Sequence, residues 1–321
     1  MRSFYRLIAA SLALFVVAAC HRQPAVDEHI AHMSAADLKA QPGANVASQG
    51  VAGLPPSGSQ ALARLESTPR HGEWVKVAWE PGSRDSLMAW IVYPSTTNAK
   101  SPVVVVIHEN TGLIPWVRSV ADQAAAEGFI AIAPDLLSRV RGGPSTELLA
   151  RDSVSKIISG VNSVERNRGI AAVARYAMSQ PSAAPRYAVI GYCWGGSTTW
   201  MHAVNGGISG FVGGVAFYGL PPGTAPFADS LAKVKVPVML LNGSKDARIG
   251  SAMPTVDSVM KALGKSYVGK NYEGAVHGFL RAQADPRPQN RDEAEEQANL
   301  AATKDAWPRT VEFLKKNLGV K

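Results

Sequence analysis

Residues 187–196 read YAVIGYCWGG, an apolar run followed by a turn that contains three glycines. Glycines at such a turn accept a strained backbone and let neighbouring chains approach closely. A strand that enters such a turn and a helix that leaves it form the elbow that presents a nucleophile above a sheet. The pattern G-x-C-x-G-G therefore predicts Cys193 as a catalytic thiol. The alternative is a small buried cysteine beside a structural turn.

Segments on both sides of this elbow alternate between strand-like and helix-like patterns. Two alternating runs at 73–79 and 86–94 flank the turn EPGSRD and predict a β-hairpin. The run PVVVVIH is continuous and β-branched, which is typical of a strand buried on both faces. Further strands are expected at 129–135, 186–191, 210–219, 236–243 and 266–274, and helices at 117–128, 164–180, 195–204, 251–264 and 291–318. We expect the last helix to break at Pro308.

This alternation predicts an α/β fold with a doubly wound, mainly parallel sheet and helices on both faces. One domain over residues 71–321 accommodates the whole pattern. A content of 46% hydrophobic and 18% charged residues is that of a globular protein. The formal charge of +8 is not gathered into basic clusters interleaved with aromatics, so nucleic acid is not an expected partner.

The first twenty residues predict export. Arg2 and Arg6 precede an apolar run from Leu7 to Ala19, which has the length of a signal peptide and is short for a membrane span. The run ends in VAAC, which resembles the lipobox of bacterial lipoproteins, so residues 1–19 are expected to be cleaved and Cys20 lipidated. The alternative is an ordinary secretory signal. We expect a membrane-anchored lipoprotein facing the periplasm, or a secreted periplasmic protein if Cys20 stays unmodified.

Residues 20–70 are rich in Ala, Gly, Ser, Pro and Gln and show no sustained period, which predicts a flexible linker between the lipid anchor and the domain. Their loosely spaced histidines are interpreted as solvated rather than metal-binding. Because Cys20 and Cys193 are the two cysteines of the chain, lipidation of the first excludes a disulfide to the second.

A thiol needs a group that accepts its proton. In doubly wound hydrolases the chain order is nucleophile, acid, base. His277 lies in a glycine-flanked loop after a predicted strand, whereas His202 lies inside the helix after the elbow and is expected to pack there. Asp246 follows the carboxyl end of a buried strand, where catalytic loops gather, and is the expected partner of His277. The other acids between Cys193 and His277 are Asp229, Asp257 and Glu273.

Together, the segments VVVIHENTGL, VADQAAAEGFIAIAPDLLS, GYCWGG, LNGSKD and HGFLR resemble the dienelactone hydrolase family of α/β-hydrolases. The resemblance runs from about residue 100 to 281. It implies a Cys-His-Asp triad, no cofactor, and lactones or other activated esters as substrates, which are opened through an acyl-enzyme.

The resemblance also implies roles for residues that the bare pattern does not single out. Glu109 matches the family glutamate that contacts the resting thiol and helps its deprotonation; the alternative is an acid that orders the loop. The elbow pattern already makes the backbone N–H of Trp194 an oxyanion donor, and the resemblance adds a second N–H, that of Asn110. Arg281 matches an arginine that binds a substrate carboxylate, with an exposed surface charge as the alternative. The family's second such arginine stays unassigned among Arg151, Arg166 and Arg168.

No metal is expected, because an H-E-x-x-H motif starting at His108 would need a histidine where Gly112 stands. The sequence therefore predicts a hydrolase that cleaves a small ester or lactone through Cys193. A thioester hydrolase or acyl-transfer enzyme with the same triad is the alternative among enzymes. A catalytically silent ligand-binding protein on the same fold is the alternative of another class.

Overall fold

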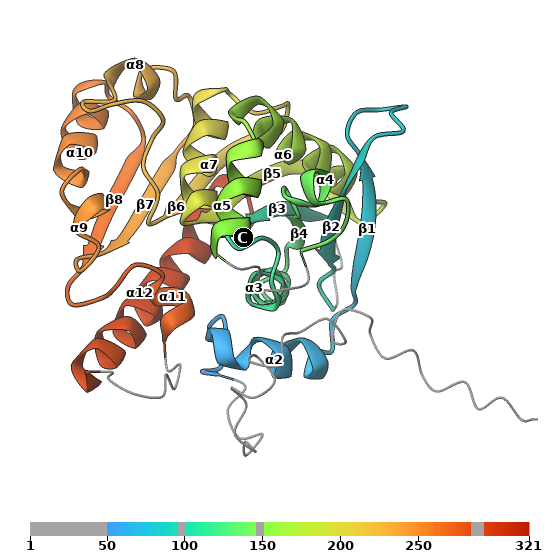
Figure 1. Cartoon of the computed structure of the whole chain (residues 1–321), viewed down its shortest axis with the longest axis horizontal. Helices are drawn as coiled ribbons and strands as arrows, with labels where there is room; N and C mark the ends of the chain where they lie inside the picture. Colours follow the sequence, from blue (N-terminus) through green and yellow to red (C-terminus); the bar gives the residue numbers. More distant parts are fainter. Residues whose placement is uncertain (1–49, 96–99, 146–150, 284–291, 321) are drawn as a thin grey trace, which may run out of the picture.

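An eight-stranded sheet forms the centre of the computed structural model, which describes residues 50–95, 100–145, 151–283 and 292–320. The strands lie in the order β1-β2-β4-β3-β5-β6-β7-β8 (Figure 1). Their bounds are β1 Gly72–Ala78, β2 Ser86–Val92, β3 Ser101–Ile107, β4 Ile130–Pro134, β5 Ala183–Tyr192, β6 Phe211–Phe217, β7 Val238–Gly243 and β8 Tyr267–Tyr272.

The sheet is mixed and mostly parallel. From β4 through β3, β5, β6 and β7 to β8, each neighbouring pair is parallel. Only β2 runs against its neighbours, since it pairs antiparallel with both β1 and β4. The β1–β2 pair is the predicted hairpin, and the mainly parallel sheet is confirmed. Because parallel strands end at the same edge, the loops after β3, β5, β6, β7 and β8 meet there.

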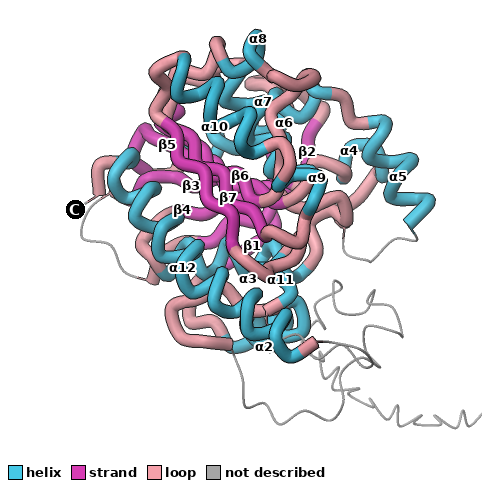
Figure 2. The backbone as a smooth tube through the Cα atoms, turned by 90° about the vertical axis from the view of Figure 1, so that its left-hand side faces the viewer, coloured by secondary structure: helices cyan, strands magenta, loops and turns pink. Residues whose placement is uncertain are grey.

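Helices cover both faces of the sheet (Figure 2). On one face lie α3 and α12, and on the other lie α6, α7 and α10. The helices are η1 Gly58–Gln60, α2 Ala61–Ser67, α3 Pro115–Ala126, α4 Ser138–Arg141, α5 Arg151–Gly160, α6 Ser163–Met178, α7 Trp194–Val204, α8 Ala228–Leu231, α9 Ala247–Gly250, α10 Met253–Ala262, α11 Phe279–Ala282 and α12 Glu293–Leu318.

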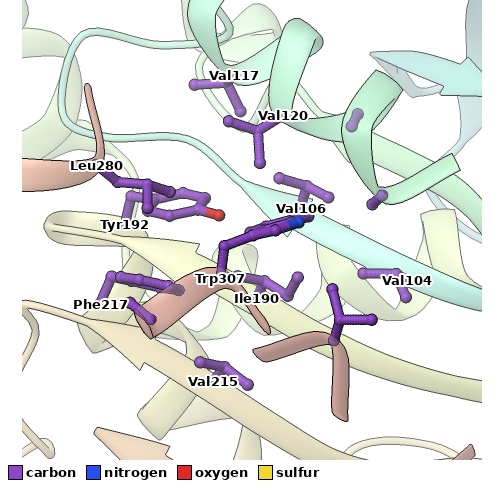
Figure 3. Packing of buried hydrophobic residues seen from close by; sticks show 14 of the residues in the cluster. Val104, Val106, Val117, Val120, Ile190, Tyr192, Val215, Phe217, Leu280 and Trp307 are labelled. Atoms are coloured by element: carbon purple, nitrogen blue, oxygen red, sulfur yellow. The ribbon is translucent and has the colours of Figure 1, made fainter. Parts of the chain in front are cut away.

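The core against α3 and α12 shows why β3 and β5 carry apolar runs. Every residue of β3 is buried, and its alternate side chains face opposite layers. Figure 3 shows Trp307 of α12 lying among Val106 of β3 and Ile190 of β5, all of them essentially inaccessible to solvent. Burial of such side chains stabilises the fold by about 1.5–3 kcal/mol each.

The expected break at Pro308 is wrong, because α12 continues through it. Proline removes one backbone hydrogen bond and crowds the preceding turn, at a cost of about 3 kcal/mol. The residues beside it, Ala306, Trp307 and Val311, are buried in the core. Their packing offsets that cost and holds the helix together.

The predicted linker is also wrong over its last part, because residues 50–70 are folded against the domain. Asp122 of α3, almost fully buried, accepts from Arg64 at 2.9 Å, from Arg70 at 2.7 and 2.8 Å, and from Thr68 at 2.5 Å. Leu54 and Ala61 are buried in the core. The composition indicates a linker, but long-range contacts with the Asp122 carboxylate hold this segment against the domain.

The predicted signal peptide, the lipidated Cys20 and residues 20–49 of the linker lie outside the described residues and stay predictions. In the part of the chain that the structure describes, no helix is both long enough and apolar enough to span a membrane.

Candidate active site

Cys193 stands at the carboxyl end of β5, directly before α7. Its backbone angles are φ 56° and ψ −114°, a conformation that side-chain-bearing residues rarely adopt. The backbone N–H of Cys193 donates to the carbonyl of Phe217 at 3.0 Å, and Ser197 N–H donates to the carbonyl of Cys193 at 3.1 Å. These bonds hold the strained residue in place, and strain of this kind concentrates at functional sites.

The elbow requires glycines because neighbouring backbone segments lie too close for a side chain. A Cβ atom on Gly195 would lie 2.5 Å from the carbonyl oxygen of His108 and 2.6 Å from that of Ile107. A Cβ atom on Gly191 would overlap the Gly195 carbonyl. Helix α7 therefore begins directly against the ends of β3 and β5, where a larger residue would push it away.

His277 and Asp246 come together at the same edge of the sheet. His277 follows β8, and its Nδ1 atom lies 2.5 Å from Oδ2 of Asp246 in the loop after β7. The Asp246 side chain is 7% exposed, and its other oxygen accepts from the backbone N–H of Ile249 at 3.2 Å. An ionised carboxylate accepts only, so Nδ1 carries the proton and Nε2 is left for the thiol.

Both Cys193 and Asp246 change the pKa of His277. Burial alone would lower it, but hydrogen bonds to Cys193 and Asp246 outweigh burial and raise the pKa to about 9. The structure thus brings the three predicted triad residues together, with His277 bonded to Asp246 and close enough to Cys193 for the two to influence each other's charge. The acids left as alternatives lie elsewhere: Asp229 in α8, Asp257 in α10 and Glu273 after β8.

Glu109 and Arg281 form an ion pair that the sequence does not predict. Nε of Arg281 donates to Oε2 of Glu109 at 2.8 Å; the carboxylate is 6% exposed and the guanidinium side chain 36% exposed. From the sequence, Glu109 is expected to contact the thiol and Arg281 to bind a substrate carboxylate. The pair joins the loop after β3 to α11, 172 residues further along the chain, and no local pattern signals such a contact.

Arg281 is supported from the N-terminal side. A Cβ atom on Gly58 would lie 3.3 Å from Cγ of Arg281, so η1 touches the stem of this side chain. Next to it, Gln283 Nε2 donates to the carbonyl of Pro55 at 2.8 Å. The folded segment before the sheet therefore forms part of the wall behind Arg281.

Trp194, the first residue of α7, lies between two side chains. Its ring is stacked on His108 with centroids 5.4 Å apart and planes 10° apart, and the Arg166 guanidinium carbon lies 5.1 Å from the ring centre. The N–H groups at the start of a helix have no partner within it. Trp194 thus has a firmly held backbone N–H beside the thiol, while Asn110, the other expected donor, is exposed in the loop after β3.

His108 is neutral and structural. Burial lowers its pKa, although the charge of Asp135 acts in the opposite direction. Leu136 N–H donates to its Nε2 at 3.1 Å, so Nδ1 carries the proton and donates to the Glu109 carbonyl at 2.5 Å. His202 is structural as predicted: it is buried between Tyr187 and Asn167, at 2.9 and 2.6 Å, and burial lowers its pKa to about 3.

Two buried tyrosines beside the site, Tyr192 and Tyr218, were not predicted from the sequence. The Tyr218 ring lies 4.8 Å from the His277 ring, and burial and the charge of Glu109 raise the pKa values of Tyr192 and Tyr218. Neither hydroxyl has a hydrogen-bond partner among the described residues. Tyr218 directly follows β6, so the rule that placed Asp246 at a strand end could have found it.

The three candidates for a second carboxylate-binding arginine lie in different surroundings. Arg168 pairs with Glu80 at 2.8 Å, and Arg166 lies over Trp194. Arg151 is the first residue of α5, and its side chain is outside the described part of the structure. Within the described ranges, no three His, Cys, Asp or Glu side chains are grouped closely enough to hold a metal ion.

This strand–elbow–helix arrangement at the carboxyl edge of a mostly parallel sheet is the α/β-hydrolase fold. The profile of the dienelactone hydrolase family matches residues 87–318, and the chain belongs to that family. It is a hydrolase of the dienelactone hydrolase type, distantly related to carboxymethylenebutenolidases.

Known relatives agree with this assignment. A carboxymethylenebutenolidase from Pseudomonas sp. (strain P51) is 30% identical over 68% of this chain and 85% of its own length. A Salmonella typhimurium protein that provisionally carries the same name is 26% identical over 81% of this chain and 94% of its own. A solved Klebsiella pneumoniae structure, provisionally titled a dienelactone hydrolase, is 25% identical with a TM-score of 0.60, covering 76% of this chain and 98% of its own.

Proposed function

We propose that this protein hydrolyses a small ester or lactone with Cys193 as the nucleophile. The observation that supports this most directly is His277, which lies 2.5 Å from Asp246 and whose pKa is raised by interaction with Cys193 as well as with Asp246. A nucleophile, a base and an oriented carboxylate within hydrogen-bond reach are the elements that acyl transfer requires.

The thiol must lose its proton to attack. With Asp246 holding one proton on Nδ1, the raised pKa of His277 favours transfer of the thiol proton to Nε2, and the carboxylate stabilises the imidazolium that forms beside the thiolate. Glu109 is a second acceptor in this proposal. Its carboxylate is engaged by Arg281, so a substrate carboxylate that draws Arg281 away would free Glu109 to take part in deprotonation.

The thiolate sulfur then forms a bond to the acyl carbon. In this proposal the N–H groups of Trp194 and Asn110 donate to the oxyanion of the tetrahedral intermediate. The C–O bond of the ester breaks, and the leaving oxygen takes the proton from Nε2 of His277. Water, activated by the same imidazole, attacks the thioester, which releases the carboxylic acid and restores the thiol.

Arg281 suits a substrate that carries a carboxylate, because a guanidinium fork donates two parallel hydrogen bonds to such a group. The name shared by the relatives describes a lactone with a carboxymethylene substituent, which agrees with this chemistry. No metal or cofactor takes part in the proposed reaction.

The test compares p-nitrophenyl acetate hydrolysis by the wild type, Cys193→Ala and Cys193→Ser. We expect Cys193→Ala to lose at least a thousandfold in kcat/KM, about 4 kcal/mol, and iodoacetamide to inactivate the wild type only. Equal rates in the wild type and Cys193→Ala would favour a ligand-binding protein on a hydrolase fold. Full activity in Cys193→Ser would show that the sulfur is not required.

We also propose that the mature protein begins at Cys20 and reaches the periplasm as a lipoprotein. The support is the sequence alone: a basic start, the apolar run from Leu7 to Ala19 and the VAAC site. Metabolic labelling with a radioactive fatty acid should mark the wild type but not Cys20→Ala. If the wild type is unlabelled and found in the soluble periplasmic fraction, Cys20 is not lipidated and the protein is secreted into the periplasm without an anchor.

A further inference from the structure

A pocket lies beside α7, the helix that follows the elbow. It encloses about 460 Å³, and its walls come from α6, α7, α9 and the loop between β6 and α8. None of Cys193, His277, Glu109 or Arg281 lines it. Its volume suits a ligand of fewer than about twenty non-hydrogen atoms, within the usual range for small-molecule sites.

Two arginines from different elements reach this pocket. Arg166 comes from α6 and Arg248 from α9. Most arginine contacts in the described chain end on carboxylates, such as those of Arg139 with Asp85 and Arg168 with Glu80. By contrast, Arg166 bonds to the Thr198 hydroxyl, and neither Arg166 nor Arg248 has a carboxylate partner among the described residues. Two positive charges therefore face a pocket whose lining, among the described residues, contains no carboxylate.

Arg166 shows the requirement for a partner most clearly. It is half-buried, and its Nη1 donates to Thr198 Oγ1 at 3.1 Å. Its Nε atom is buried and has no acceptor among the described residues. Burial lowers the pKa of this guanidinium, which remains charged at any physiological pH. The protein leaves this buried Nε–H unsatisfied, and the accessible part of the half-buried guanidinium is the part that an anion in the pocket can reach.

The rest of the wall is both polar and apolar. Ser163 contributes a hydroxyl at the first position of α6, where helix N–H groups favour negative charge. Met201, Leu220 and Phe227 contribute apolar surface. An inorganic anion would leave this surface without a contact, whereas a carboxylate attached to a compact apolar body would use both parts.

We infer that this pocket binds a small organic carboxylate, with the carboxylate between Arg166 and Arg248 and the apolar body against Met201, Leu220 and Phe227. The site is separate from the one at Arg281. It is also linked to the elbow, because Arg166 lies over the Trp194 ring and its partner Thr198 donates to the Trp194 carbonyl at 2.8 Å. Occupancy would therefore be felt by the residue whose N–H is the proposed oxyanion donor.

The test uses the full chain with Cys193→Ala, so that binding is measured without turnover and independently of the proposed reaction. The probe is 3-phenylpropionate, titrated by calorimetry or ligand-observed NMR, with 3-phenylpropanamide as a neutral ligand of the same shape and inorganic phosphate as an anion without an apolar body. We expect the amide and phosphate each to bind at least about tenfold more weakly than the acid.

Arginine variants locate the site. Arg166→Gln should weaken 3-phenylpropionate binding about tenfold. Arg248→Gln should weaken it about threefold, because the Arg248 side chain is exposed and its charge is better screened by water. Arg168→Gln, on the same helix but paired with Glu80, and Arg281→Gln should each change affinity less than twofold. Arg248→Gln keeps the test decisive even if Arg166→Gln fails to fold.

Three results would overturn the inference. The first is that the Cys193→Ala protein with both arginines intact binds no 3-phenylpropionate at tens of millimolar. The second is that acid and amide bind alike. The third is that Arg281→Gln abolishes binding while Arg248→Gln leaves it unchanged, which would place the anion in the catalytic site.

Discussion

Asp246→Asn tests the orientation of the catalytic histidine. In the wild type the carboxylate fixes the proton on Nδ1 of His277 across 2.5 Å. An asparagine can instead present its NH₂ group to Nδ1, which would place the proton on Nε2 and leave nothing to accept the thiol proton. The position of the His277 ring would stay almost unchanged, but its proton would be on the nitrogen that has to accept the thiol proton.

The size of the effect follows from the site. The pKa of His277 is raised from 6.5 to about 9, which corresponds to about 3.4 kcal/mol between the two protonation states. Its side chain is 38% exposed, so solvent screening reduces this to about 2 kcal/mol, shared between Cys193 and Asp246. We therefore expect Asp246→Asn to lower the pKa of His277 by about 1 unit and kcat/KM by about a thousandfold.

The assay is an NMR pH titration of the His277 ring carbon beside steady-state hydrolysis of p-nitrophenyl acetate. Asp229→Asn is the matched control, because it makes the same change at an exposed acid in α8 and should alter neither quantity. If Asp246→Asn kept a His277 pKa near 9 and wild-type hydrolysis, the carboxylate would have no part in orienting the base.

Three further predictions concern stability and the elbow. Asp122→Ala should lower the free energy of unfolding in urea by about 3–5 kcal/mol, because it leaves the nearly buried Arg64 and Arg70 without their carboxylate; a change below 1 kcal/mol would show that residues 50–70 are not held there. Because the folded pKa of His277 lies above its unfolded value, its stabilising contribution of about 1–2 kcal/mol should be complete below pH 6.5 and disappear as the pH rises through about 9. Unfolding of the wild type and His277→Gln at pH 6 and pH 10 measures this, and a gap that widens at high pH would contradict it. Gly195→Ala should abolish activity and lower the melting temperature, since its Cβ would meet two backbone carbonyls at 2.5 and 2.6 Å, whereas Gly143→Ala, with open space around it, should do neither.

Local patterns explain why much of the fold could be predicted. The glycines of the elbow and the β-branched run of β3 each report on their own surroundings. Chain order and the common edge of parallel strands then place Asp246 and His277 near Cys193.

Contacts between distant segments could not be predicted in this way. The pairing of Glu109 with Arg281 and the docking of residues 50–70 on Asp122 join parts of the chain that share no periodic signal. The Pro- and Gly-rich composition of that segment indicates a linker, although two of its proline carbonyls accept bonds from Trp116 and Gln283. Packing of neighbours around Pro308 likewise overrides the tendency of proline to end a helix.

Mass spectrometry of the covalent intermediate tests the nucleophile most directly. Protein quenched in acid during turnover of an aryl acetate should carry one acetyl group, and peptide mapping should place it on Cys193. The adduct should be absent from Cys193→Ala and should accumulate in His277→Gln if residual acylation outpaces deacylation. Continued hydrolysis by the wild type with the acetyl group on another residue, such as Ser197 one turn along α7, would contradict the account.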